Sequence, residues 1–158
     1  MVNSLSSIVY ICLMIEVFFP KPAFKIERRD EKDFIFDTIC RQWIMLTDEE
    51  WVRQNFIRYL VQEMKYPETL IAIEKEIQLG ELKKRFDILV YDKDHQPWML
   101  VECKAADVIL DDKVFQQVLR YHISVPCSFL IITNGPYTFG WEKAGGELKA
   151  LQEMPGWG

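Results

Sequence analysis

The chain contains 158 residues, of which 49% are hydrophobic and 27% are charged, and its formal net charge is −5. This length fits one domain with a core of its own, and the composition excludes a disordered or fibrous chain. The acidic charge argues against a broad electrostatic grip on nucleic acid, so any nucleic-acid site would have to be local.

The cysteines and the N-terminus indicate a cytoplasmic protein without a membrane partner. The cysteines show neither C-x-x-C pairing nor histidine partners at zinc spacing, which favours a reduced protein: Cys12, Cys40, Cys103 and Cys127. Residues 8–19 are mostly apolar, but Glu16 interrupts them and they are too short to span a bilayer. They also lack the flanks of a signal peptide. We interpret residues 1–13 as an upstream extension before a start at Met14, and residues 14–158 as a single domain.

The first half of the chain predicts a small β-meander followed by a helix. Short apolar segments at 24–26, 34–36 and 43–46 are separated by polar residues, as in a meander. Thr47 and Glu50 have the spacing of a capping box, so a helix is expected to begin there. It is expected to end near Lys65, because Pro67 cannot continue it.

The rest of the chain predicts further strands and a second helix. Residues 70–79 alternate as a strand, with one apolar face made of Ile71, Ile73, Ile77 and Leu79. Asp111 or Asp112 is expected to cap a helix, and the apolar run 127–133 predicts a strand buried on both faces. We expect an edge strand at 137–141 and a short helix at about 147–153. This order of elements predicts an α/β fold with a mixed sheet flanked by helices.

A central hairpin carries the most informative side chains. Residues 85–91 (RFDILVY) and 98–104 (WMLVECK) read as strands joined by a polar turn at 92–97. In an antiparallel hairpin centred on that turn, Tyr91 opposes Trp98 and Asp87 opposes Glu102, with Lys104 on the same face as Glu102. Opposed carboxylates repel each other, and a divalent cation between them would remove the repulsion.

This arrangement predicts metal-assisted hydrolysis. Asp87 and Glu102 would offer oxygen donors to Mg²⁺, together with the main-chain carbonyl of Cys103, and Mn²⁺ is expected to substitute. Lys104 would orient the attacking water and stabilise the charge that develops during the reaction. The alternative is a solvated sheet face with an incidental salt bridge between Glu102 and Lys104. The surrounding hydrophobic residues argue against that alternative.

The combination of Asp87 with Glu102-Cys103-Lys104 resembles the active-site motif of the PD-(D/E)xK nuclease superfamily. More narrowly, the chain resembles the N-terminal nuclease domain of the type I restriction enzyme R subunit. The segments that carry this resemblance are 49–54, 66–67, 74–76, 83–88, 101–105, Gln117, Tyr121 and 133–135. The resemblance implies a restriction-endonuclease-like α/β core and Mg²⁺-dependent cleavage of DNA.

Two departures from the family bear on activity. Phe86 stands where the superfamily has its proline, and the sequence contains neither a P-loop nor a helicase motor. We therefore expect either a homodimer or a separately encoded motor or specificity partner. The alternative function is a non-catalytic DNA-binding or assembly module that uses the nuclease fold.

Several further residues are candidates for supporting roles. The resemblance implies that an acid on the first helix completes the metal site. Glu50 is the best match, although its capping box is an equal alternative and Glu76 a weaker candidate. It also implies that Gln117 supports the site and that Tyr121 contacts the DNA backbone, with a polar helix surface as the alternative. Arg53, one turn from Glu50, could orient that residue or contact a phosphate, and a surface ion pair is the alternative. Lys84 and Arg85 could hold a phosphate or could lie in a solvated turn. His122 has no evident partner in the sequence.

Overall fold

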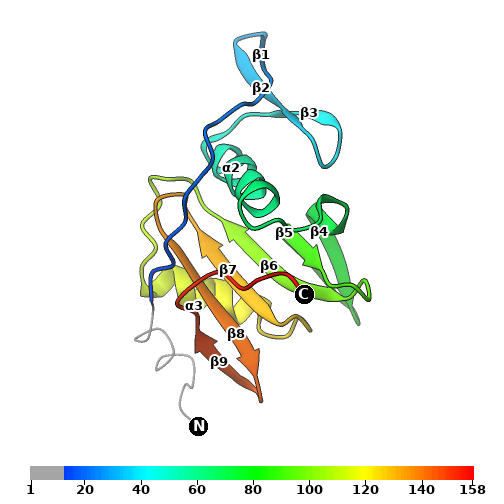
Figure 1. Ribbon diagram of the computed structural model, residues 1–158, viewed down its shortest axis with the longest axis vertical. Helices are drawn as coiled ribbons and strands as arrows, with labels where there is room; N and C mark the ends of the chain where they lie inside the picture. The colour runs from blue at the N-terminus through cyan, green and yellow to red at the C-terminus, as the bar shows by residue number, and fades with distance from the viewer. Residues whose placement is uncertain (1–12) are drawn as a thin grey trace.

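Two helices pack on opposite faces of a six-stranded mixed sheet, and a separate three-stranded meander lies beside the first helix (Figure 1). The computed structural model describes residues 13–158. The elements are β1 (Ile26–Arg29), β2 (Lys32–Asp37), β3 (Gln42–Met45), α2 (Asp48–Gln62), a 3₁₀ turn (Glu68–Leu70), β4 (Ile71–Leu79), β5 (Leu82–Tyr91), β6 (Pro97–Cys103), α3 (Asp112–His122), β7 (Phe129–Thr133), β8 (Thr138–Ala144) and β9 (Glu147–Ala150).

The larger sheet has the order β4-β5-β6-β7-β8-β9, and only the β6–β7 pair is parallel. A parallel pair needs a crossover connection, which α3 supplies. The fold is therefore a restriction-endonuclease-like α/β fold, as the sequence predicts. Among the described residues, no helix is both long and apolar enough to cross a membrane.

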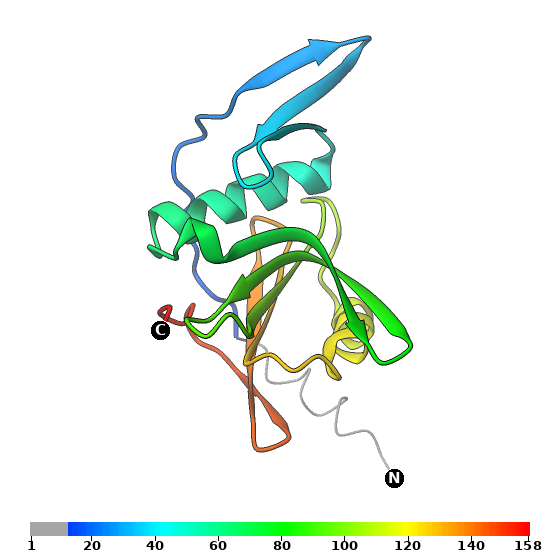
Figure 2. The same cartoon turned by 90° about the vertical axis from the view of Figure 1, so that its right-hand side faces the viewer.

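The sheet separates two hydrophobic clusters, and each helix covers one of them (Figure 2). The α2 side buries alternate strand residues together with Phe56 and Leu60, and the α3 side buries the other strand residues together with Phe115 and Leu119. Strands of a sheet with both faces covered must be apolar on both faces. This arrangement agrees with the continuous apolar run of β7.

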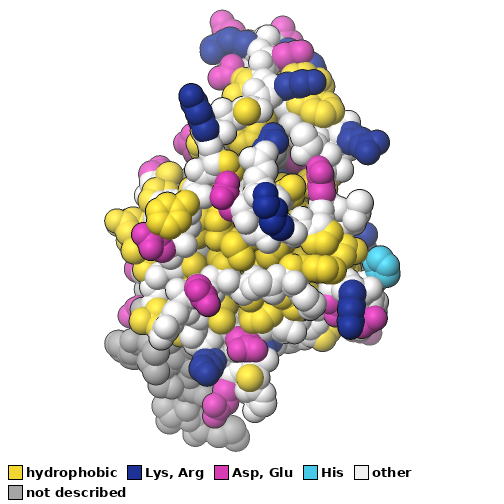
Figure 3. All heavy atoms as spheres, viewed as in Figure 1, with side chains coloured by type: hydrophobic (Ala, Val, Ile, Leu, Met, Phe, Trp, Pro, Cys, Tyr) yellow, Lys and Arg dark blue, Asp and Glu magenta, His cyan; other side chains and the backbone are white. Residues whose placement is uncertain are grey.

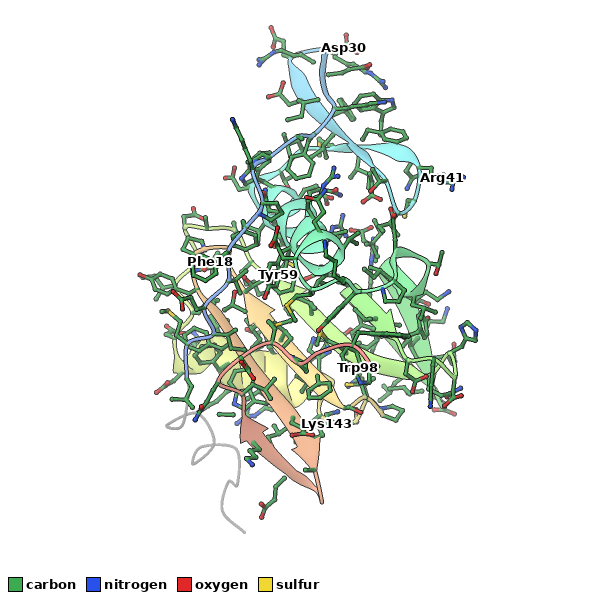
Figure 4. The ribbon with its side chains drawn as sticks, in the orientation of Figure 1. Phe18, Asp30, Arg41, Tyr59, Trp98 and Lys143 are labelled. Carbon is green, nitrogen blue, oxygen red and sulfur yellow. The ribbon has the colours of Figure 1, made fainter. Side chains whose placement is uncertain are left out.

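The meander is confirmed, and it packs on α2 through its inner face. Ile35 is fully buried, and the rings of Phe24 and Trp51 meet edge to face at 5.4 Å. The β1–β2 hairpin projects from the body, with Asp30 at its tip and Arg41 at the next turn (Figure 4). Charged side chains of both signs cover this projection (Figure 3).

Helix α2 begins as predicted and ends earlier than predicted. The Thr47 hydroxyl accepts the backbone N–H of Glu50 at 3.1 Å, which satisfies one of the free donors of the first turn. The helix ends at Gln62, three residues before the predicted end. Lys65 has a left-handed backbone (φ 59°), so the chain has already left the helix before Pro67.

The central hairpin has the predicted register over most of its length. Ile88 pairs with Val101 and Val90 with Met99. The predicted pairing of Tyr91 with Trp98 is wrong, because the register shifts at the end of the strand and Tyr91 pairs with Pro97. A bulge of this kind places two residues of one strand against one of the other.

The predicted single apolar face of β4 is wrong. Ile71 and Ile73 pack in the cluster under α2, whereas Ile77 and Leu79 pack against the cluster under α3. Glu74 has a left-handed backbone (φ 46°), and no strand pairing is formed at this step of the ladder. The alternation of side chains is therefore interrupted in the middle of the strand.

The neighbouring strand β5 is irregular at the same step. Phe86 belongs to the α3 cluster and Ile88 to the α2 cluster, although residues two apart in a regular strand share a face. Asp87 lies between them. Asp87, the first candidate catalytic residue, thus lies where the side chains of two adjacent strands, β4 and β5, switch from one face of the sheet to the other.

The C-terminal part corrects two predictions. The segment at 147–153 forms no helix, because Gly145 and Gly146, both with positive φ, make a two-residue turn that folds β9 back on β8. Glycine pairs with positive φ form the primed turns of hairpins. Consequently β9 is the edge of the sheet, and the segment that we predicted as an edge strand, in β8, is internal. The expectation for residues 1–13 lies, apart from Leu13, outside the described residues.

Candidate active site

Asp87 points its carboxylate toward β6. Its Oδ2 accepts the backbone N–H of Cys103 at 2.7 Å, so a side chain takes the place of a ladder hydrogen bond. Burial, and then the charge of Glu102, raise the pKa of Asp87 from 3.8 to about 7. The two carboxylates predicted to oppose each other are therefore close enough to disfavour double ionisation.

Glu102 is held from two sides. Lys104 Nζ lies 3.4 Å from its Oε1, and His122 Nε2 lies 3.4 Å from its Oε2. Burial alone would raise the pKa of Glu102, but the hydrogen bond and charge of His122, followed by Lys104, outweigh it and lower the pKa. Glu102 is thus the carboxylate of the pair that stays ionised, while Asp87 is the one that protonates first.

His122 is a site residue that sequence reasoning missed. It lies on the last turn of α3, is only 3% exposed, and packs its ring against Phe86 at 5.1 Å and Tyr121 at 4.7 Å. The residues near His122 in the sequence include no partner for it. Glu102 lies close to His122 only because α3, in the crossover from β6 to β7, packs on the sheet. No local pattern encodes that contact.

Two lysines hold the C-terminal end of α3. Lys84 Nζ donates to the Tyr121 carbonyl and to Ser124 Oγ at 2.8 Å. Lys143 of β8, labelled in Figure 4, donates to the carbonyls of His122, Ile123 and Val125. The last carbonyls of a helix lack partners within the helix and carry partial negative charge, so nearby ammonium groups stabilise them.

The alternative of a solvated turn is therefore wrong for Lys84, which is 8% exposed. Its ammonium also lies 4.9 Å from the centre of the Tyr121 ring. Tyr121 turns its hydroxyl toward β5, where it accepts the backbone N–H of Arg85 at 3.3 Å. Both residues join α3 to the strand that carries Asp87.

An open groove of about 980 Å³ leads to Glu102 and Lys104. Its walls are α3 and the β4–β5 hairpin, which extends beside that helix (Figure 2). Gln117 and Tyr121 line it, as does one acid, Glu102. The basic residues that line it are Lys83, Lys84, Lys104, Lys113 and Arg120. The groove is thus strongly basic in a chain of net charge −5.

Glu50 and Arg53 belong to a buried network on α2 rather than to this groove. Arg53, 3% exposed, pairs with Glu50 and, at 3.1 Å, with Glu74. The amide of Gln54 donates to Glu50 at 2.8 Å and to Asp37 of the meander at 2.6 Å. The alternative of a surface ion pair is wrong for Arg53, because both Arg53 and Glu50 are buried. The contact of Arg53 with the Glu50 carboxylate agrees with the expectation that Arg53 orients Glu50.

The remaining candidates lie at the surface of β4 and β5. Arg85 is exposed and pairs with Glu74, and Glu76 is exposed with an oxygen 3.4 Å from Lys83 Nζ. Neither acid of β4 is grouped with both Asp87 and Glu102. In the part of the chain that the structure describes, no three His, Cys, Asp or Glu side chains form a group that could hold a metal ion.

The donor set nevertheless fits a hard divalent cation. Mg²⁺ keeps several waters and is commonly held by one or two carboxylates together with substrate phosphates, so a third acid is not required. Asp87 and Glu102 are such a pair, and burial, followed by the charge of Glu102, raises the pKa of Asp87. The side chain of Cys103 is fully buried in the core, which leaves only its main chain facing the site region.

The fold defines a restriction-endonuclease-like α/β domain. The model of the family "type I restriction enzyme R protein N terminus" matches residues 48–155, and the chain belongs to this family. The match begins at α2, so the β1–β3 meander lies outside it. None of the curated proteins compared with the chain matches it.

Proposed function

We propose that this protein hydrolyses DNA phosphodiester bonds with Mg²⁺, using Asp87, Glu102 and Lys104. The observation that carries the proposal is the pairing of two partly buried carboxylates, one of which has its pKa raised to about 7, beside a lysine ammonium. Perturbed carboxylate pairs of this kind gather at catalytic sites, because folding gains nothing from placing like charges together.

Asp87, Glu102 and the Cys103 carbonyl would hold the cation. Once bound, it supplies Lewis-acid charge at the phosphoryl oxygens. Asp87 must ionise for this role, and its hydrogen bond from the Cys103 N–H already favours the ionised form. The proposal assigns no ligand role to Glu50, because Arg53 and Gln54 occupy its carboxylate.

Lys104 acts directly on the reacting groups. Its ammonium, adjacent to Glu102, orients the attacking water and stabilises the negative charge that develops on the phosphate. Water attacks phosphorus and releases a proton to solvent, the bond to one bridging oxygen breaks, and that oxygen takes up a proton, so the products are a phosphate monoester and a hydroxyl group. The ammonium also offers positive charge to the phosphate in the ground state.

The basic groove supports a polyanionic substrate. Its walls bring Lys113 and Arg120 of α3 and Lys83 of β5 to the same opening as Lys104. Gln117 and Tyr121 line it as well, in keeping with the supporting roles expected from the family resemblance. Lys84, Arg85 and Arg53 act through the structure around the site, since each is already engaged by other groups.

The test is cleavage of supercoiled plasmid in Mg²⁺ or Mn²⁺ by the wild type and by Asp87→Asn and Lys104→Met. We expect both variants to cut at least about 100-fold more slowly, the scale of losing one group that stabilises the transition state. Lys149→Ala, at an exposed lysine of β9, is the matched control and should cut normally. Equal rates in all four proteins reject the mechanism.

Binding of DNA without cleavage by the wild type would instead support the non-catalytic module. Cleavage of both strands by one such site requires repeated nicking or a second active site. We therefore propose that the protein works either as a homodimer or with a separately encoded motor or specificity partner. Sedimentation of the protein with and without DNA tests the first arrangement.

A further inference from the structure

The His122 imidazole is buried, and Glu102 is the polar side chain that it contacts among residues 13–158. The side chain is enclosed between α3 and the sheet, and Nε2 lies 3.4 Å from Glu102 Oε2. The other ring nitrogen, Nδ1, is buried and has no hydrogen-bond partner among the described residues. A ring that served only to fill space would leave a buried polar atom unpaired at a cost in free energy that a phenylalanine would avoid.

We infer that His122 is a positioning residue, which donates a hydrogen bond from Nε2 to Glu102 and so fixes the carboxylate for cation binding. This inference rests on the proposed function of the same site. It assigns His122 no contact with the substrate and no part in proton transfer.

The physical need for such a residue follows from the glutamate side chain. Ordering a free glutamate side chain costs rotamer freedom, a cost that binding of the cation would otherwise bear. Ligating carboxylates are commonly held by hydrogen bonds from further residues, whose loss weakens metal binding about 10–100-fold. A separation of 3.4 Å is long for a hydrogen bond, as is usual in sites without their ligands.

Lys104 cannot supply this restraint alone. Its ammonium, at 3.4 Å from Oε1 of Glu102, ends a flexible stem and is assigned to the substrate side of the site. His122 contacts the opposite oxygen, Oε2, from the buried side. One oxygen of Glu102 thus contacts the flexible Lys104 side chain, and the other contacts the fixed His122 ring.

The imidazole is itself rigidly held. Phe86 and Tyr121 contact its ring, and the His122 carbonyl accepts a hydrogen bond from Lys143 Nζ at 3.1 Å. Lys84 anchors the carbonyl of the preceding residue. A group that positions another must be locked by its own surroundings, and these four contacts lock both the ring and its backbone.

The test is Mn²⁺ binding measured by calorimetry without DNA, for the wild type, His122→Phe and His122→Gln. The phenylalanine keeps the ring volume and removes the donor, so its Mn²⁺ affinity should fall about 10–100-fold. The glutamine amide can donate near the Nε2 position and should restore the affinity to within about threefold of wild type. A purely structural role predicts no such rescue. His95→Gln, at the exposed histidine of the β5–β6 turn, controls for loss of an imidazole.

A ¹⁵N NMR spectrum of the wild-type histidines supplies a readout that needs no variant. The inference predicts a proton on Nε2 of His122, and a spectrum with the ring proton only on Nδ1 overturns it. Wild-type Mn²⁺ affinity in His122→Phe, or equal losses in both variants, overturns the inference alone. A wild-type protein that binds no Mn²⁺ overturns the proposed function and this inference with it.

Discussion

The Asp87 carboxylate accepts the backbone N–H of Cys103 at 2.7 Å, across the strand pair that carries the candidate site. The Asp87 side chain therefore takes the place of a ladder hydrogen bond between β5 and β6. It does so at the step where the side chains of β4 and β5 switch faces of the sheet. This contact fixes Asp87 in place, whereas burial and Glu102 make its ionisation unfavourable. The site is thus ordered and electrostatically strained at once, and a bound cation would relieve that strain.

The ionisation of Asp87 should make stability depend on pH. The folded protein keeps the proton up to about pH 7, whereas the unfolded chain loses it near pH 3.8, so between these values the folded state binds more protons. The free energy of unfolding contributed by Asp87 therefore falls as the pH rises from about 4 to about 7. Urea unfolding in EDTA at pH 5 and pH 8 measures the change.

The variant Asp87→Asn cannot ionise and should lose this part of the pH dependence. Glu102, Glu49 and Arg53 act on the same group and remain in the variant, so the comparison isolates Asp87. Identical changes in unfolding free energy between pH 5 and pH 8 in both proteins would contradict the raised pKa.

Removing the ammonium of Lys84 should destabilise α3 at its C-terminal end. The variant Lys84→Met leaves the Tyr121 carbonyl and Ser124 without their buried donor, and we expect a loss of about 1–3 kcal/mol in chemical unfolding. Lys83→Met, at the exposed neighbouring lysine, should change stability by less than about 0.5 kcal/mol. A similar, small effect of both substitutions would show that the contact contributes nothing.

The charged wall of the groove should contribute to DNA affinity in a salt-dependent way. Each cation that neutralises a phosphate adds about one unit to the slope of log K against log salt, so Lys113→Ala and Arg120→Ala should each lower the slope by about 1. Fluorescence anisotropy with labelled duplex at several salt concentrations measures the slope. Lys149 lies outside the groove and serves as the control. If Lys149→Ala lowered the salt slope of DNA binding as much as Lys113→Ala does, DNA binding would not be localised to the groove.

The buried amide of Gln54 should tie the meander to the rest of the molecule. Gln54→Ala removes the shared donor of Asp37 and Glu50, two buried carboxylates, and should cost more than about 2 kcal/mol. Gln62→Ala, at an exposed glutamine of the same helix, serves as the reference. Equal unfolding midpoints for the two variants would show that the hydrogen bonds of Gln54 do not stabilise the attachment of the meander.

The sequence predicts the elements whose signals are local. The N-caps of α2 and α3 each join residues three apart: Thr47 accepts the Glu50 N–H, and Asp111 rather than Asp112 accepts the Val114 N–H. The Glu50 carboxylate is bonded to Arg53 and Gln54 instead of completing a capping box. The register of the central hairpin follows from the polar turn between two apolar runs. The approach of Asp87 to the end of β6, where it accepts the Cys103 N–H, depends on that register, and for this reason the sequence could bring Asp87 near Glu102.

Other features depend on contacts between distant segments. Residues 147–150 are good helix formers, yet the Gly145-Gly146 turn and pairing with β8 make them a strand. The facing change at Glu74 depends on its left-handed backbone, which no alternation pattern signals for a glutamate. The contact of His122 with Glu102 arises only when the crossover helix packs on the sheet.

The central proposal is that Asp87 and Glu102 together bind the cation and that Lys104 acts on the reacting groups next to it. An anomalous difference map from crystals soaked in Mn²⁺ tests it most directly. We expect one strong peak within ligand distance of both carboxylates and of the Cys103 carbonyl. A peak that avoids both carboxylates, in crystals where Mn²⁺ occupies other acidic residues, would contradict it.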